Sequence, residues 1–178
     1  MGHNLIPILE DHCGAFLPMH MPGHKRNIAL TGDGGYLQRL AADLDVTETA
    51  QFDDLHNPTG PLRDSMAAAA RLWGSEGSYF LVNGSTCGIL AGLLAAAGQE
   101  STVIVARNCH KSVYNGLELL NARPKFIYPE MEPLTGAYDP VTARQVAEAL
   151  DACPDTRLVV LTSPTYEGLV SDVADICR

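Results

Sequence analysis

Residues 100–128 read ESTVIVARNCHKSVYNGLELLNARPKFIY, and this stretch decides the fold class. It holds an apolar run at Thr102 to Ala106, a helical pattern over His110 to Asn121, and a second short apolar run at Lys125 to Tyr128. A strand, a crossover helix and a second strand are the repeating unit of a parallel sheet. Both runs are continuous rather than alternating, which indicates strands buried on both faces. The stretch therefore predicts an α/β fold.

The same alternation of strands and helices continues on both sides of this stretch. We expect a mostly parallel sheet with helices on both faces, because right-handed crossovers stack successive helices on the sheet. The further elements predicted are a helix over Pro61 to Trp73 ended by Gly74, a buried strand over Ser78 to Val82, a helix over Ser85 to Ala97 closed by Gly98, a helix capped by Asp139 with Pro140 at its first position, a strand over Arg157 to Thr162, and a last helix capped by Asp172.

The first part of the chain differs from the rest in composition and periodicity. Residues 1–60 are rich in Gly, Pro, His and Asp and show little periodicity, whereas residues 61–178 carry the regular pattern. This change predicts an irregular N-terminal segment, 1–60, followed by the α/β region, 61–178.

Composition excludes several classes of protein. The 178 residues are 46% apolar and 19% charged, which is not the composition of a disordered chain. The formal net charge of -9 argues against a nucleic-acid partner, which needs a basic face. Apolar runs are too short for a membrane span, and Met1 to Glu10 lacks the pattern of a secretory signal, so we expect a cytoplasmic protein.

Metal sites are not predicted either. The five cysteines form no CxxC pair, so we expect reduced and mostly buried thiols rather than a zinc site or disulfides. His20 and His24 are four residues apart, but the Pro22-Gly23 step forbids the helix that would align them as ligands.

Ligands of parallel sheets bind at the carboxyl ends of the strands, so the turns that follow the strands are the candidate sites. In the turn Asn83 to Gly88, Gly84 can adopt a positive φ, and Ser85 and Thr86 then open a helix whose free N–H groups attract an anion. This turn predicts a phosphate site. The alternative is an ordinary serine cap after a tight turn.

The next turn, Arg107 to Ser112, contains His110. A histidine at this edge can act as acid, base or ligand, or stack on an aromatic ring, and the alternative is that it caps its own helix. Cys109 lacks the partners of a thiol nucleophile. The turn Ser163 to Gly168 is again rich in hydroxyl groups and is expected at the same edge.

Carboxylates gather ahead of His56, and we interpret them as a solvated acidic loop. They are Asp43, Asp45, Glu48, Asp53 and Asp54.

Together these segments resemble one family, the bacterial ornithine/lysine/arginine decarboxylases, which are pyridoxal-phosphate enzymes with the aspartate-aminotransferase-type fold (fold type I). Six motifs occur in the family's order over roughly Met19 to Asp172. They are Met21-Pro-Gly-His-Lys25, Asp45-Val-Thr-Glu48, Phe52-Asp-Asp-Leu-His-Asn-Pro-Thr-Gly-Pro61, Asn83-Gly-Ser-Thr-Cys-Gly88, Arg107-Asn-Cys-His-Lys-Ser112 and Ser163-Pro-Thr-Tyr-Glu-Gly168.

The resemblance implies roles for these residues. It implies that Gly84, Ser85 and Thr86 hold the phosphate of pyridoxal 5'-phosphate, that His110 stacks on the pyridine ring as the catalytic-site histidine, and that Thr165 lies near the cofactor. It further implies a basic amino acid as substrate, a role in amino-acid metabolism and polyamine biosynthesis, and a homo-oligomer in which residues 1–60 contribute to the dimer or active site. Residues 61–178 then form the first part of the cofactor-binding major domain.

The family's Schiff-base lysine and its acid against the pyridine nitrogen lie beyond the Ser163–Gly168 motif, and Lys25, Lys111 and Lys125 match neither. We therefore expect an N-terminal fragment of a decarboxylase, inactive by itself. The alternatives are a non-catalytic module that binds phosphate esters or a partner, and a second chain that supplies the missing half.

Overall fold

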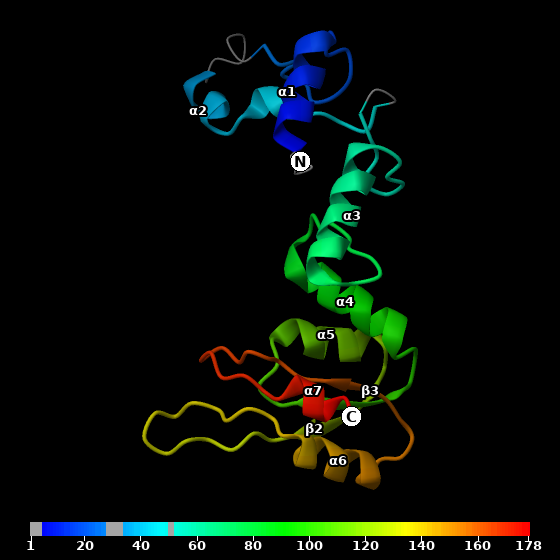
Figure 1. Cartoon of the computed structure of the whole chain (residues 1–178), viewed down its shortest axis with the longest axis vertical. Helices are drawn as coiled ribbons and strands as arrows, with labels where there is room; N and C mark the ends of the chain where they lie inside the picture. The colour runs from blue at the N-terminus through cyan, green and yellow to red at the C-terminus, as the bar shows by residue number, and fades with distance from the viewer. Residues whose placement is uncertain (1–4, 28–33, 50–51) are drawn as a thin grey trace. The chain divides into compact units, whose positions relative to one another are not determined.

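The computed structural model describes residues 5–27, 34–49 and 52–178. The chain divides into two units, Met1–Phe80 and Leu81–Arg178 (Figure 1). The boundary between the units lies about twenty residues after the change in composition near residue 60, because helix α3 (Pro61–Trp73) belongs to the first unit. Of the segment Met1 to Glu10, the first four residues lie outside the described part. Along the described ranges, no helix combines the length and the hydropathy that crossing a bilayer requires.

The second unit contains a three-stranded parallel sheet in the order β2-β1-β3. The central strand β1 (Thr102–Ala106) pairs with β2 (Arg123–Ile127) and with β3 (Thr156–Val160). All five residues of β1 are buried, as its continuous apolar run predicts. Helices α5 (Lys111–Leu119) and α6 (Ala143–Ala152) connect successive strands and lie on opposite faces of the sheet in Figure 1. The predicted α/β class is confirmed.

One apolar cluster holds this unit together. Residues 103–105 of β1 are completely buried, and side chains from the helices on both faces pack onto them. Helix α4 (Gly84–Ala96) packs against α5, and Gly116 permits the close approach. A methyl group added at Gly116 would lie 2.4 Å from Leu93 Cδ1, well inside van der Waals contact.

The predicted strand over Ser78 to Val82 is wrong. This segment has no regular secondary structure and belongs to no sheet, and Tyr79 and Val82 are 82% and 74% exposed. A strand exists only where its N–H and C=O groups pair with a neighbouring strand. Among the described residues no strand takes that place, so apolar composition alone was insufficient.

The start of α6 also differs from the prediction. Thr142, rather than Asp139, is its N-cap, and Thr142 and Gln145 form a reciprocal capping box. This pair satisfies two backbone donors at once, which a lone Asp-Pro step cannot do. Asp139 instead donates its N–H to Glu130 in the loop before the helix. The predicted cap of the last helix, α7 (Val173–Ile176), is confirmed, because Asp172 accepts the N–H of Asp175 at 2.9 Å.

The first unit is made of helices and connecting segments. They are α1 (Leu5–Ala15), α2 (Gly34–Arg39), the 3-10 helix η2 (Ala42–Leu44) and α3. The α3 prediction is confirmed at both ends: Pro61 lies in its first turn, and Gly74 ends it with a φ of 66° that favours glycine.

Candidate functional site

The carboxyl ends of the three strands lie on one side of the sheet, because the strands are parallel. Figure 1 shows the long segments after β2 and β3 leaving on this same side. Two contacts tie the strand ends together. Arg107 donates its N–H to the Ile127 carbonyl at 2.8 Å, and the Thr162 hydroxyl donates to Cys109 Sγ at 3.4 Å. The turns after β1 and β3 are therefore neighbours.

The first candidate turn is an open helix N-terminus. Helix α4 begins at Gly84, whose φ of 70° is the left-handed conformation that the sequence predicts. Asn83 occupies the N-cap position but makes no side-chain hydrogen bond to the helix, and Ser85 and Thr86 are exposed. The first-turn N–H groups and both hydroxyls are thus open to a ligand. Such a terminus attracts anions through its donors and the positive end of the helix dipole.

The second candidate residue, His110, caps its own helix. It is the N-cap of α5, and its Nδ1 accepts the backbone N–H of Ser112 at 3.2 Å. The same Nδ1 lies 2.8 Å from the Ser112 hydroxyl oxygen. His110 itself is exposed. His110 therefore caps its helix through Nδ1, and its Nε2 and ring faces remain available to a ligand.

Thr165 lies in the loop after β3 and is 6% exposed. Its N–H donates to the Leu169 carbonyl at 2.8 Å, and its hydroxyl accepts the N–H of Leu169 at 3.3 Å. Ser163 also closes this loop by accepting the N–H of Ser171. The Thr165 side chain is thus engaged within its own loop, and it differs in this from the exposed hydroxyls of Ser85 and Thr86.

The candidate residues meet only in part. Cys109 and Thr162 join the turn that carries His110 to the start of the loop that carries Thr165. No hydrogen bond among the described residues joins Ser85 or Thr86 to either turn. Ser85 and Thr86 follow no strand of this sheet, so strand direction does not bring them to its carboxyl edge. Helix α4, which they open, packs on α5, the helix that His110 caps.

The cysteines agree with the sequence prediction in being free thiols but not in their burial. All five cysteines are unpaired, but just Cys109 is buried, so the expectation of mostly buried thiols is wrong. Burial raises the pKa of Cys109, and the hydroxyl of Thr162 opposes this rise only partly. A thiol that stays protonated is a poor nucleophile. Within the described residues, no group of three or more His, Cys, Asp and Glu side chains is placed to hold a metal ion.

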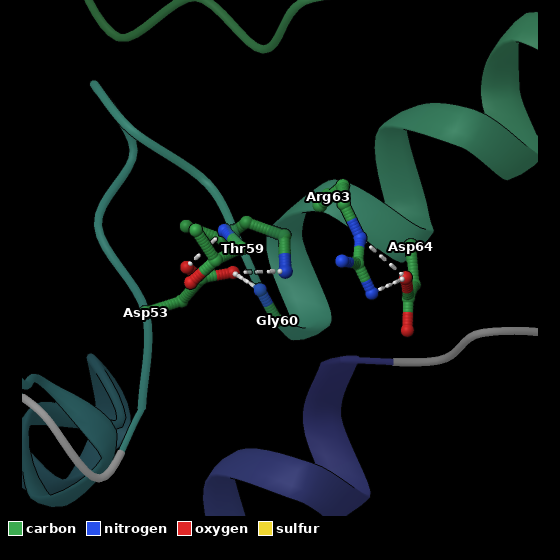
Figure 2. Close-up of polar contacts among 6 residues, drawn as sticks. Asp53, Thr59, Gly60, Arg63 and Asp64 are labelled. Atoms are coloured by element: carbon green, nitrogen blue, oxygen red, sulfur yellow. Dashed lines mark hydrogen bonds and ion pairs between the residues drawn. The ribbon is translucent and has the colours of Figure 1, made fainter.

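The interpretation of Asp53 as part of a solvated loop is wrong. Asp53 is 8% exposed, and its carboxylate accepts four backbone N–H groups, three of them around the start of α3. Figure 2 shows its bonds to Thr59 and Gly60. The donors are Asp54 and Thr59, both at 2.9 Å, Gly60 at 3.0 Å and Leu62 at 2.8 Å. Burial of the carboxyl opposes its ionisation, but these donors prevail and hold the pKa of Asp53 below its ordinary value. The sequence offered one sign of this role, because Asp53 lies shortly before the turn-forming run Pro58-Thr59-Gly60-Pro61 and aspartate often accepts backbone N–H groups in turns.

A hollow of about 450 Å³ lies beside Asp53 in the first unit. Its wall mixes apolar side chains, such as Phe52 and Leu62, with the acidic side chains of Asp45, Glu48 and Asp54. The Thr47 hydroxyl donates to Glu48 at 2.6 Å and lowers the pKa of that carboxyl. The hollow is therefore an acidic surface at neutral pH.

Comparison with known proteins identifies the family. Residues 15–178 match the model of the Orn/Lys/Arg decarboxylase major domain. An uncharacterized protein of Bacillus subtilis, YaaO, is 38% identical over 157 residues, which are 88% of this chain and 33% of that protein. An arginine decarboxylase of Halalkalibacterium halodurans is 32% identical over 158 residues, 88% of this chain and 32% of that protein.

Solved structures agree on the fold. Lysine decarboxylase A of Pseudomonas aeruginosa superposes with a TM-score of 0.72 at 26% identity, covering 90% of this chain and 24% of that one. The constitutive lysine decarboxylase of E. coli gives the same TM-score at 24% identity, covering 92% and 25%. The chain spans about a third of the length of the first curated relatives it matches. On the match over residues 15–178, this chain belongs to the Orn/Lys/Arg decarboxylase family.

Proposed function

We propose that this chain is the N-terminal part of a pyridoxal-phosphate-dependent decarboxylase that acts on arginine, lysine or ornithine. The family match and the names of its relatives, arginine and lysine decarboxylases, support this class of substrate. The same proposal includes a cytoplasmic location, a role in amino-acid metabolism and polyamine biosynthesis, and a homo-oligomeric assembly.

The observation that carries the proposal is the uncapped N-terminus of α4. Gly84 has a φ of 70°, and no side chain at the N-cap accepts the N–H groups of the first turn. The Ser85 and Thr86 hydroxyls add two donors, both exposed. A phosphate dianion needs several donors from one side, and this donor set fits that need.

His110 fits the other end of such a ligand. Its ring is exposed at the carboxyl edge and its Nδ1 is held by Ser112, so a planar ring can stack on its free face. Bound pyridoxal phosphate supplies the electron sink for the charge left when carbon dioxide departs. This chain's part is to bind the phosphate and to place the ring. Thr165 acts through its loop, whose closed shape it maintains.

We infer that the chain does not decarboxylate by itself. Lys25 donates to the His20 carbonyl at 2.5 Å in the first unit, Lys111 begins α5, and Lys125 lies on β2. None of them corresponds to the family's Schiff-base lysine. The groups that complete the reaction then come from residues outside this chain.

Titration with pyridoxal phosphate, followed by its fluorescence, tests the phosphate site. Ser85→Ala combined with Thr86→Ala removes two donors to a dianion, each worth about 1.5–3 kcal/mol before solvent exposure reduces it. We expect binding to weaken at least about 10-fold, whereas the control Thr142→Ala, which removes a capping hydroxyl from α6, should leave it unchanged. Equal binding by the double variant and the wild type would refute the site.

Two further arms separate this function from its alternatives. Reduction with borohydride in the presence of pyridoxal phosphate should yield no stoichiometric adduct at any single lysine, because none has a matching motif. A stoichiometric adduct accompanied by release of carbon dioxide from a basic amino acid contradicts the inactive fragment. Glycerol phosphate that binds as tightly as pyridoxal phosphate favours a non-catalytic phosphate-ester module.

A further inference from the structure

His110 is an exposed side chain between two buried anchors. Cys109 on one side is 8% exposed, and its N–H donates to the Ala106 carbonyl at 3.1 Å. Ser112 on the other side is 1% exposed and lies in the first turn of α5. The main chain at His110 is thus held both at the end of β1 and in the helix. The backbone that carries the His110 ring is therefore fixed in place.

The contacts of Ser112 determine which nitrogen of His110 carries the proton. A backbone N–H can only donate, so the Ser112 N–H at 3.2 Å requires a lone pair on His110 Nδ1. The Ser112 hydroxyl, 2.8 Å from the same nitrogen, then donates as well. We infer that Ser112 is a positioning residue that holds neutral His110 as its Nε2–H tautomer, with the ring fixed at the start of α5.

The Ser112 hydroxyl adds to the preference for an unprotonated Nδ1 that the Ser112 N–H establishes. A proton on Nδ1 would point at the Ser112 N–H, and only rotation of the hydroxyl would offer it an acceptor. Because Ser112 is buried and its neighbour Val113 packs in the apolar cluster, the oxygen itself stays in place. Histidines that bind metals or substrates are oriented in the same way, by a hydrogen bond to the nitrogen that does not bind.

This arrangement defines what His110 presents to a ligand. Its free groups are the ring face and an Nε2–H donor, which suit a planar aromatic ligand that carries an acceptor atom at its rim. The role towards such a ligand rests on the proposed function, in which the ligand is pyridoxal phosphate. The tautomer does not, because it follows from contacts within the chain.

Nitrogen-15 NMR of the wild-type chain tests the tautomer without any ligand. At a pH of about 8.5 an ordinary histidine is neutral, and the shifts of Nδ1 and Nε2 then report which one is protonated. His110→Gln assigns the signals. We expect a protonated Nε2 and an unprotonated Nδ1 for His110. A protonated Nδ1 would overturn the inference, whether or not any variant folds.

The variant Ser112→Ala measures how much the Ser112 hydroxyl contributes to the tautomer preference of His110. We expect the shifts of Nδ1 and Nε2 to move toward each other, as for a mixture of tautomers in fast exchange, because only the backbone donor remains. Pyridoxal phosphate binding should weaken about 3- to 10-fold, the effect of one hydrogen bond. Ser112→Thr should restore both. The matched control Thr142→Ala also loses a hydroxyl at a helix start and should change neither the His110 signals nor binding.

The outcomes separate this inference from the proposed function. If Ser112→Ala keeps the wild-type tautomer and affinity while His110→Ala weakens binding, Ser112 is only structural and the inference fails alone. If Ser112→Ala changes the tautomer while His110→Ala and the Ser85/Thr86 double variant bind normally, the positioning holds and the proposed function fails.

Discussion

The two units of this chain are stabilised by different means. In Leu81–Arg178, most of the buried side chains are apolar, and these form one cluster around β1. In the described part of Met1–Phe80, the buried apolar side chains are Met66 and Ala70, and polar groups hold the connecting segments. Asp53 accepts four backbone N–H groups, and Arg26 donates to the carbonyl of Cys13 within α1 and to that of Phe16, the residue after α1. Apolar burial is non-directional, whereas a carboxylate organises only the donors it touches.

This comparison predicts that the second unit responds most strongly to lost volume. Ile104 is completely buried at the centre of β1, so Ile104→Ala should lower the free energy of unfolding of this unit by about 2–5 kcal/mol. Hydrogen exchange in increasing urea, resolved by peptide, measures each unit separately. An equal loss of protection in residues 52–73 would contradict independent sources of stability.

The first unit should respond instead to the loss of one carboxylate. Asp53→Ala leaves four N–H groups without their acceptor, and we expect a loss of about 1–3 kcal/mol, because buried donors are costly to leave unpaired. The same exchange experiment should show the loss at the start of α3 and not in β1. The control is Asp64→Ala. The Asp64 carboxylate forms an ion pair with exposed Arg63, and losing such a surface pair should cost little (Figure 2).

A smaller effect should follow from crowding between α4 and α5. Gly116→Ala places a methyl group 2.4 Å from Leu93 Cδ1, and Leu93 is only 4% exposed. We expect a net loss of about 1 kcal/mol, because overpacking exceeds the gain in helix propensity. The matched control is Gly92→Ala in α4, which meets nothing within 4 Å and should stabilise by about 0.5–1 kcal/mol. Equal stabilisation by both substitutions would mean that α4 and α5 are not tightly packed.

The smallest effect should come from titration of Asp53. Its pKa is lowered in the folded state, so its contribution is complete above the ordinary value of 3.8 and is lost as the pH falls through the lowered pKa. A protonated carboxyl still accepts some of the N–H groups, so the change stays below that of Asp53→Ala. Pepsin cleavage near residues 53–62, followed from about pH 4.5 down to about pH 2.5, should rise in the wild type more steeply than in Asp53→Asn.

Much of the second unit could be predicted from local patterns. The run Thr102 to Ala106 is apolar throughout and is a strand buried on both faces. Gly84 was expected at a positive φ and adopts it. Such features depend on neighbours within a few residues, so the sequence contains the whole cause. The segment Ser78 to Val82 has equally apolar residues but forms no strand, since a strand also needs a partner.

In the candidate site, too, some features follow from the local sequence and others from tertiary packing. The amino-acid sequence by itself determined that Gly84, Ser85 and Thr86 open a helix and that His110 begins another, because turn and capping preferences act over a few residues. Only the tertiary structure decided that Thr162 contacts Cys109, that Ser112 is buried against His110, and that Asp53 is enclosed rather than solvated. Contacts between distant residues and the burial of a polar group arise only when the elements pack, since packing decides which donors and acceptors lose water.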